Sequence, residues 1–236
     1  MALLPALLLA AAPVAITSAT PDLDFRYVWS NEAQALPALS RRFRADASTR
    51  KAEMLRMAAA EKAFRRKAKL DWNGLQFSRE WQTLGQSAAL LSLVSTTSAY
   101  TGGAHPNTNI RALLWDRRAN REITTAALLQ SRKSWDGAIR QPFCVLLDSE
   151  RAKRRQGPVT GDNWASQCPA LKELTVALAD RNRNGRFDHV AVTADAYVGG
   201  PYAEGAYTIT LPLTAAMLTR LKPAYRAGFE PQPPVQ

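Results

Sequence analysis

The segment between residues 77 and 116 constrains the fold more than any other part of the chain. It is typical of three strands in succession, at residues 78–86, 88–100 and 110–115, separated only by short turn sequences. Strands joined this closely form antiparallel hairpins, because a parallel pair needs a long crossover. A block of such strands set apart from the helices predicts an α+β fold, with an antiparallel sheet and helices packed on one side.

A long helix is expected before these strands. Residues 41–69 are rich in Ala, Arg, Lys and Glu, contain no Pro or Gly, and carry apolar side chains at helical spacing. We therefore expect residues 20–76 to form an N-terminal segment built around this helix. The stretch from Pro21 to Pro37 is expected to be irregular.

The rest of the chain alternates between helical and strand patterns. We expect one α+β domain over residues 77–229 and a short tail over residues 230–236. Within that domain, the patterns after residue 116 predict a turn at 116–121, helices at 124–130 and 135–155, strands at 174–178, 187–194 and 207–211, and a closing helix at 213–229.

The amino end has the pattern of a secretory leader. Residues 1–16 form a run rich in Leu and Ala, and three small residues follow it. Such a run matches the apolar region and exit of a signal peptide, and it is short for a membrane span. We expect residues 1–19 to be a signal peptide cleaved near Ala15 or Ala19, and the protein to be periplasmic or secreted. A buried N-terminal helix is the alternative. No second apolar stretch is long enough for a transmembrane helix in the mature chain.

The two cysteines agree with export. Cys144 and Cys168 are the only thiols of the chain, and an oxidising compartment favours a disulfide between them. Closing a loop of this length stabilises the fold by about 3 kcal/mol in the chain-entropy model. Two buried free thiols are the alternative.

The charge of the chain favours anionic partners. Its 236 residues carry a formal net charge of +11, which attracts polyanions in general. However, the sequence has no zinc-finger spacing, aromatic RNA-binding strand or recognition helix, so we expect no nucleic-acid partner. Arginine on solvated surfaces is the plainer explanation of the charge.

Two glycine-rich loops carry the candidate ligand-binding residues. The first spans residues 100–108, where adjacent glycines permit positive φ and allow backbone amides to face a ligand. The second spans residues 195–205. The candidates are Tyr100, Gly102, Gly103, His105, Asn107, Tyr197, Tyr202 and Glu204. The alternative is that the glycines and Glu204 serve the geometry of the loops.

These loops also carry a resemblance to a known family. The run Tyr-Thr-Gly-Gly-Ala-His-Pro-Asn-Thr at residues 100–108 and the Tyr-x-x-Gly-x-Tyr-x-x-Gly pattern at residues 197–205 resemble the RsiV-like domain of unknown function. That family includes the extracellular domain of the anti-sigma factor RsiV, which senses lysozyme, and the N-terminal region of PdaC-type peptidoglycan deacetylases. The resemblance covers residues 77–229. It implies an extracytoplasmic α+β domain, like the C-terminal domain of RsiV, that binds partners at the cell envelope.

We therefore expect an envelope-associated binding domain that is not an enzyme. Its partner is expected to be a cell-envelope protein or a peptidoglycan or other glycan. No catalytic residue is assigned, because neither loop offers an evident nucleophile. The alternative is a small envelope hydrolase in which Glu204 and His105 act as a general acid–base pair, which requires the two side chains to meet in one cleft.

A calcium loop is a further possibility at residues 180–188. Oxygen-bearing side chains stand at loop positions one, three, five and nine, around a glycine at position six, which is the spacing of a calcium-binding turn. The ligands are Asp180, Asn182, Asn184 and Asp188. The acidic residue usual at position twelve is absent, so modest affinity is expected. Asn and Asp also close such turns without an ion. No other cofactor is expected.

Overall fold

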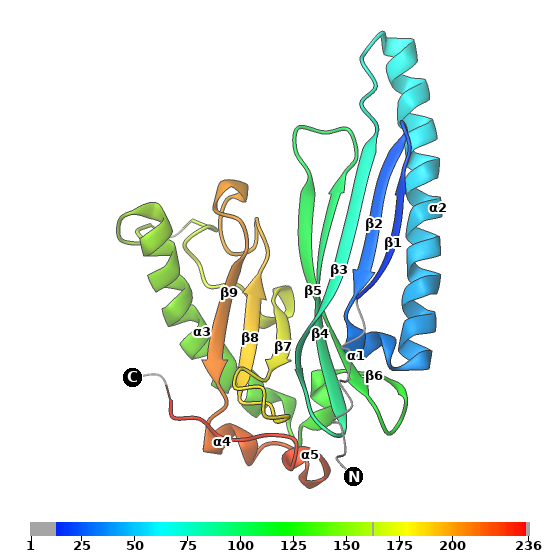
Figure 1. Ribbon diagram of the computed structural model, residues 1–236. Helices are drawn as coiled ribbons and strands as arrows, with labels where there is room; N and C mark the ends of the chain where they lie inside the picture. The colour runs from blue at the N-terminus through cyan, green and yellow to red at the C-terminus, as the bar shows by residue number, and fades with distance from the viewer. Residues whose placement is uncertain (1–12, 162, 235–236) are drawn as a thin grey trace, which may run out of the picture.

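The computed structural model describes residues 13–161 and 163–234, apart from the side chains of residues 132–134. The strands form two sheets side by side, with helix α2 (Pro37–Ala68) on the outer side of the larger sheet and α3 (Arg132–Arg155) beside the smaller one (Figure 1). Separate helices and mostly antiparallel strands confirm the predicted α+β class and the N-terminal helical segment. The strands are divided between two sheets instead of gathered in one.

The larger sheet has six strands in the order β1-β2-β3-β4-β5-β6. Its neighbours are antiparallel except β2 and β3, which run parallel, and a parallel pair requires a crossover. The short helix α1 (Asn31–Gln34) and α2 supply that crossover. The strands are β1 (Val14–Ala19), β2 (Leu23–Trp29), β3 (Leu75–Gln86), β4 (Leu90–Tyr100), β5 (Asn107–Asp116) and β6 (Arg121–Ile123).

Helix α2 covers one face of this sheet. Leu39, Phe43, Met54 and Ala58 are buried at helical spacing, and the Phe43 ring stacks on Trp81 of β3 with centroids 5.1 Å apart. The predicted helix at residues 41–69 is confirmed, with an earlier start at a proline, a residue whose fixed φ suits the first helical turn. No helix of the described residues is long and apolar enough to cross a membrane.

The amino end of the described chain is a strand. Residues 1–12, which include most of the predicted leader, lie outside the described residues. Val14–Ala19 forms β1, which pairs with β2 from Val14 opposite Trp29 to Ala19 opposite Asp24. The irregular stretch expected from Pro21 to Pro37 is wrong for β2, whose apolar residues alternate with charged ones as in a half-buried strand.

The smaller sheet has three antiparallel strands in the order β7-β8-β9. Ile139, Phe143 and Leu147 of α3 are buried in the same core as Val192 and Ile209 of the sheet. The strands are β7 (Thr175–Ala179), β8 (His189–Ala194) and β9 (Tyr207–Pro212), which lie close to the predicted ranges.

Strands β4 and β5 lie between two hydrophobic cores. Leu91 and Leu113 belong to the core under α2, whereas Leu90 and Leu114 belong to the core under α3. Successive residues of a strand point to opposite faces, so each of these strands contributes side chains to both cores. The two cores are thus joined through two strands of the larger sheet.

A disulfide joins Cys144 of α3 to Cys168 in the loop before β7, with Cα atoms 5.5 Å apart. The predicted pairing is therefore present. It fixes one end of the polar loop at residues 157–170 to the helix beside the smaller sheet.

The carboxyl end differs from the predicted closing helix. Residues 213–229 form two separate turns of helix, α4 (Ala215–Leu218) and α5 (Pro223–Arg226). A proline disfavours helical geometry in the residue before it and lacks an N–H donor, so the helix stops before Pro223. Leu221 instead bridges to Leu129.

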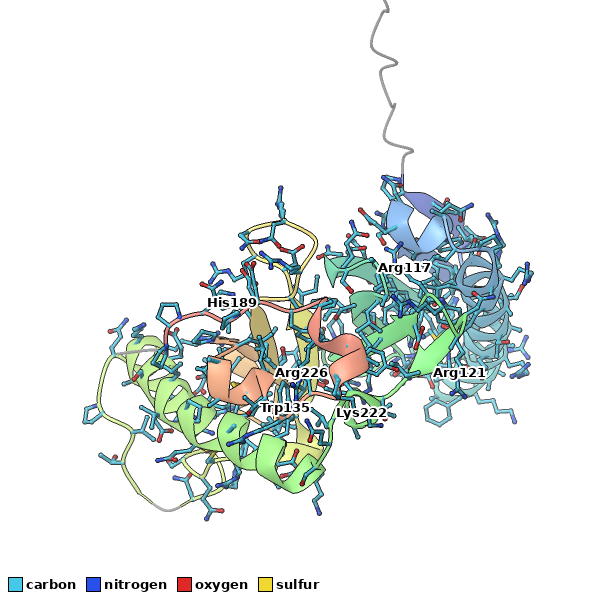
Figure 2. The ribbon with its side chains drawn as sticks, turned by 90° about the horizontal axis from the view of Figure 1, so that it is seen from below. Arg117, Arg121, Trp135, His189, Lys222 and Arg226 are labelled. Atoms are coloured by element: carbon cyan, nitrogen blue, oxygen red, sulfur yellow. A yellow bond between two sulfur atoms is a disulfide. The ribbon has the colours of Figure 1, made fainter. Side chains whose placement is uncertain are left out.

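Two smaller predictions between residues 116 and 130 also need correction. The expected turn at 116–121 ends in the short strand β6, and the expected helix at 124–130 is one 3-10 turn, η1 (Thr125–Leu128). Tyr225 of α5 lies 3.4 Å from Asp116 at the end of β5. Seen from below, Arg226 and Lys222 share this end of the molecule with Arg117 and Arg121 (Figure 2).

Candidate functional site

The two glycine-rich loops meet. The ring of His105 stacks on the ring of Tyr202, with centroids 3.7 Å apart and planes 21° apart. The ring of Tyr197 also stacks on the ring of Tyr202, with centroids 5.8 Å apart. The hydroxyl of Tyr202 donates to the carbonyl of Pro106 at 2.7 Å. We call His105, Tyr202 and Tyr197 the aromatic row; it joins the β4–β5 loop of the larger sheet to the β8–β9 connection of the smaller one.

Helix α2 holds the first loop. Arg65 of α2 pairs with Glu61 at 2.7 Å and donates to the carbonyl of Gly102 at 2.6 Å. Gly102 has a φ of +97°, a conformation that favours glycine. Tyr100 and Asn107 are the last residue of β4 and the first of β5, so the loop between them is short and closed.

Asp195 fixes the second loop. Its carbonyl accepts from the N–H groups of Val198 and Gly199. Its carboxylate accepts from the N–H of Ile110 in β5 at 3.0 Å. Burial raises the pKa of Asp195, although the Ile110 N–H and the Arg111 charge lower it. Tyr197 is thereby held at a φ of +67°, a strained conformation for a bulky residue.

Glu204 faces α3 rather than the aromatic row. Arg155 donates to both of its oxygens, at 2.8 and 3.0 Å, and Tyr207 donates to one of them at 2.6 Å. The hydrogen bond from Arg155 is the largest cause that lowers the pKa of Glu204; burial opposes it. No hydrogen bond or ion pair of the described residues joins Glu204 to His105, whose Nδ1 lies 3.0 Å from the Pro106 carbonyl. This geometry favours the structural role weighed for Glu204.

Gly200 makes room for that carboxylate. A Cβ at this position would lie 2.1 Å from a Glu204 oxygen, far inside contact distance. The second glycine-rich pattern therefore reflects close packing around the Arg155–Glu204 pair as well as loop geometry.

The sequence alone did not reveal the role of Arg151. Its side chain is fully buried and donates to the carbonyls of Gly199, Ser166 and Gln167 at 2.8, 3.1 and 3.0 Å. In the sequence, Arg151 is one of several arginines near the end of α3, where solvent exposure is the usual expectation. A signal was present, because Phe143, Leu147 and Arg151 are spaced four residues apart and lie on one face of the helix.

The candidate calcium loop is closed by its own oxygens. Asp180 accepts from the N–H groups of Asn184 and Gly185 at 3.2 and 2.9 Å. Asp188 accepts from the N–H of Arg181 at 2.9 Å. The amides of Asn182 and Asn184 donate to Glu230. These bonds are those expected when the turn folds without an ion. The described residues contain no group of three or more His, Cys, Asp or Glu placed to hold a metal.

No protein-family model matches this chain, and no curated protein matches its sequence. Two solved structures share its architecture. One is a DUF3298 family protein from Bacteroides fragilis, with a TM-score of 0.57 and 14% identity over 92% of this chain and 95% of that one. The other is a DUF3298 family protein from Pseudomonas aeruginosa PAO1, with a TM-score of 0.52 and 18% identity over 94% and 96%.

The chain has the DUF3298 fold. At these identities the likeness concerns the fold alone, and DUF3298 denotes a domain of unknown function. The narrower resemblance to RsiV and PdaC stays a prediction. Within this DUF3298-type fold, His105, Tyr197 and Tyr202 come together, whereas Glu204 is bound to α3.

Proposed function

We propose that the protein is an exported, envelope-associated binding domain, and that it contacts its partner through the aromatic row without catalysing a reaction. One observation carries the proposal: two loops from different sheets stack three aromatic rings in succession. Tyr197, at the end of the row, is 57% exposed. Exposed aromatic rings on a rigid support are typical of recognition surfaces, because they bury much area with little loss of side-chain freedom.

Export is supported by two features. The leader-like run rich in Leu and Ala that precedes β1 is one. The disulfide between Cys144 and Cys168 is the other, since disulfides persist in oxidising compartments. The partner is an envelope protein or a peptidoglycan or other glycan, as the resemblance to the RsiV-like family implies.

The contacts of the second loop disfavour catalysis. The hydrolase alternative needs Glu204 as a general acid or base beside His105. Glu204 is engaged by Arg155 and Tyr207, and its lowered pKa disfavours proton donation near neutral pH.

The test is incubation of the purified protein with peptidoglycan sacculi, scoring co-sedimentation and released soluble fragments. We expect co-sedimentation without release, weakened at least tenfold in His105→Ala and in Tyr202→Ala. Phe64→Ala is the control, because Phe64 is a 60% exposed aromatic on α2 that belongs to neither loop. Crosslinking of the same variants in envelope extracts tests whether the partner is a protein.

Two results would overturn the proposal. Release of fragments that depends on Glu204 would establish an enzyme. Equal retention of sacculi and of crosslinked partners by wild type, His105→Ala and Tyr202→Ala would remove the aromatic row from the binding surface.

A further inference from the structure

Two adjoining hollows lie beside the loop at residues 195–205. One hollow lies between Tyr197 and Trp164, and an adjoining hollow extends toward β5; the two share Glu173 and Val198 as lining residues. Trp164 is 53% exposed and Tyr197 57% exposed. Two large aromatic side chains therefore line the first of these adjoining hollows, which together we call the groove.

Charged side chains line both hollows. Arg140 and Glu173 line the first hollow, and Arg111, Asp195 and Glu173 line the second. Arg111 lies 3.6 Å from the Asp195 carboxylate. Planar guanidinium and carboxylate groups on both sides of a channel are suited to pairs of neighbouring hydroxyl or amide groups on a ligand.

A buried cation fixes the two aromatic rims relative to each other. Arg151 donates to Ser166 and Gln167 in the loop that carries Trp164, and to Gly199 in the loop that carries Tyr197. A charge without solvent is costly unless it is fully hydrogen-bonded. Here Arg151 donates to main-chain carbonyls of the two loops and to the carboxylate of Asp148.

Helix α3 secures the same loops a second time. Arg155 donates to the carbonyl of Ala165, next to Trp164, while it pairs with Glu204 in the β8–β9 connection. The disulfide holds Cys168, another lining residue, to α3. Figure 1 shows the end of α3 beside both loops. A site fixed in this way loses little entropy when a ligand binds.

Tyr197 keeps a strained backbone at this rim. Its φ of +67° suits glycine, yet the position holds a large aromatic residue with an exposed ring. Strain of this kind persists where the side chain is needed for function.

We propose that this groove binds a linear glycan strand, with Trp164 and Tyr197 stacking on sugar faces and the charged residues pairing with hydroxyl and N-acetyl groups. Flat apolar surfaces beside convergent polar groups match the two kinds of surface on a pyranose ring. An open groove also accepts a polymer better than a closed pocket does. The inference rests on the proposed function, for which it names the ligand class.

The experiment is calorimetric titration of the full chain with peptidoglycan glycan strands freed of peptide by an amidase, and separately with the released stem peptides. We expect saturable binding of the glycan strands only. Trp164→Ala and Tyr197→Gly should each weaken it at least tenfold, and Phe64→Ala should not. Tyr197→Gly removes the stacking on Tyr202 but relieves the positive φ. Its melting temperature should therefore stay near that of wild type, and a loss of binding is then not a loss of folding.

The outcomes separate the two proposals. Binding to sacculi or to an envelope protein, without binding to free glycan strands, would refute the glycan inference. The proposed binding function of the aromatic row would then still stand. Glycan binding that Trp164→Ala and Tyr197→Gly leave intact would also refute the glycan inference. Glycan binding lost in these variants supports it even if His105→Ala and Tyr202→Ala bind sacculi as wild type does.

Discussion

At the scale of single residues, two arginines of α3 organise the site. Arg151 and Arg155 are one helical turn apart, and their donors reach both loops that flank the groove. Hydrogen bonds from charged donors are about twice as strong as neutral ones. The shape of the candidate site therefore depends on side chains that a ligand does not touch.

Glu204 makes one consequence measurable through pH. Arg155, then Tyr207, hold its pKa below the ordinary value of 4.5 against the effect of burial. A lowered folded-state pKa means that ionised Glu204 stabilises the fold above pH 4.5, and that this contribution is lost as pH falls through the folded pKa. We expect Glu204→Gln to lower the free energy of unfolding by about 2 kcal/mol at pH 7 and by less at pH 3.

Thermal unfolding of wild type and Glu204→Gln across this pH range checks the prediction. Glu122→Gln is the control, because Glu122 pairs with Arg42 in solvent, with side chains 40% and 47% exposed, where such pairs contribute little. A difference between wild type and Glu204→Gln that stays constant from pH 7 to pH 3 would contradict the pKa argument.

At the scale of elements, Gly85 shows how closely the two sheets approach. It lies in β3 where the register with β4 shifts, and an added Cβ would lie 2.5 Å from the Asp180 nitrogen after β7. We expect Gly85→Ala to destabilise the protein by about 1–3 kcal/mol through overpacking. Gly137→Ala in α3 is the matched change, since its Cβ meets nothing within 4 Å and alanine favours a helix. Urea unfolding of both variants measures their free energies of unfolding. Equal values for Gly85→Ala and Gly137→Ala would contradict the close approach of the two sheets at Gly85.

Strand β1 gives a prediction about processing. Cleavage near Ala15 or Ala19 would remove part or all of a strand that pairs with β2 along its whole length. We therefore expect the mature amino end at or before Val14. Sequencing the amino end of the protein purified from an expressing cell tests this, and an end at Ala19 or Thr20 would show that the sheet begins with β2.

Elements were predictable where their pattern is local. The alternation in β3 to β5 and the uninterrupted helical run of α2 are visible in the sequence and were placed correctly. The strands within residues 14–29 are not evident from the sequence, because β1 begins inside an apolar run that resembles a leader. Strand β2 lies between β1 and a strand distant in sequence, β3. The prediction of one closing helix is wrong because Pro223 begins a separate helical turn, α5.

The candidate site was predictable only in its parts. The glycines and aromatic residues identified both loops, but nothing in the sequence tells that Tyr202 reaches Pro106. The partner of Glu204 is also non-local, since Arg155 lies 49 positions earlier. Trp164 is not predictable as a site residue, because a single aromatic residue in a polar loop forms no periodic pattern.

At the scale of the whole molecule, the shared strands β4 and β5 tie the two halves into one unfolding unit. Loss of either core would expose one face of the same two strands, with Leu91 and Leu113 on one side and Leu90 and Leu114 on the other. Neither half can then open while the other keeps its full burial, so partly unfolded states are unfavourable. We expect calorimetry to give one transition whose calorimetric and van't Hoff enthalpies agree, whereas two resolved transitions would mean that the halves melt independently. A substitution in either core should accordingly shift the melting of the entire chain, and with it the groove, however far from the groove it lies.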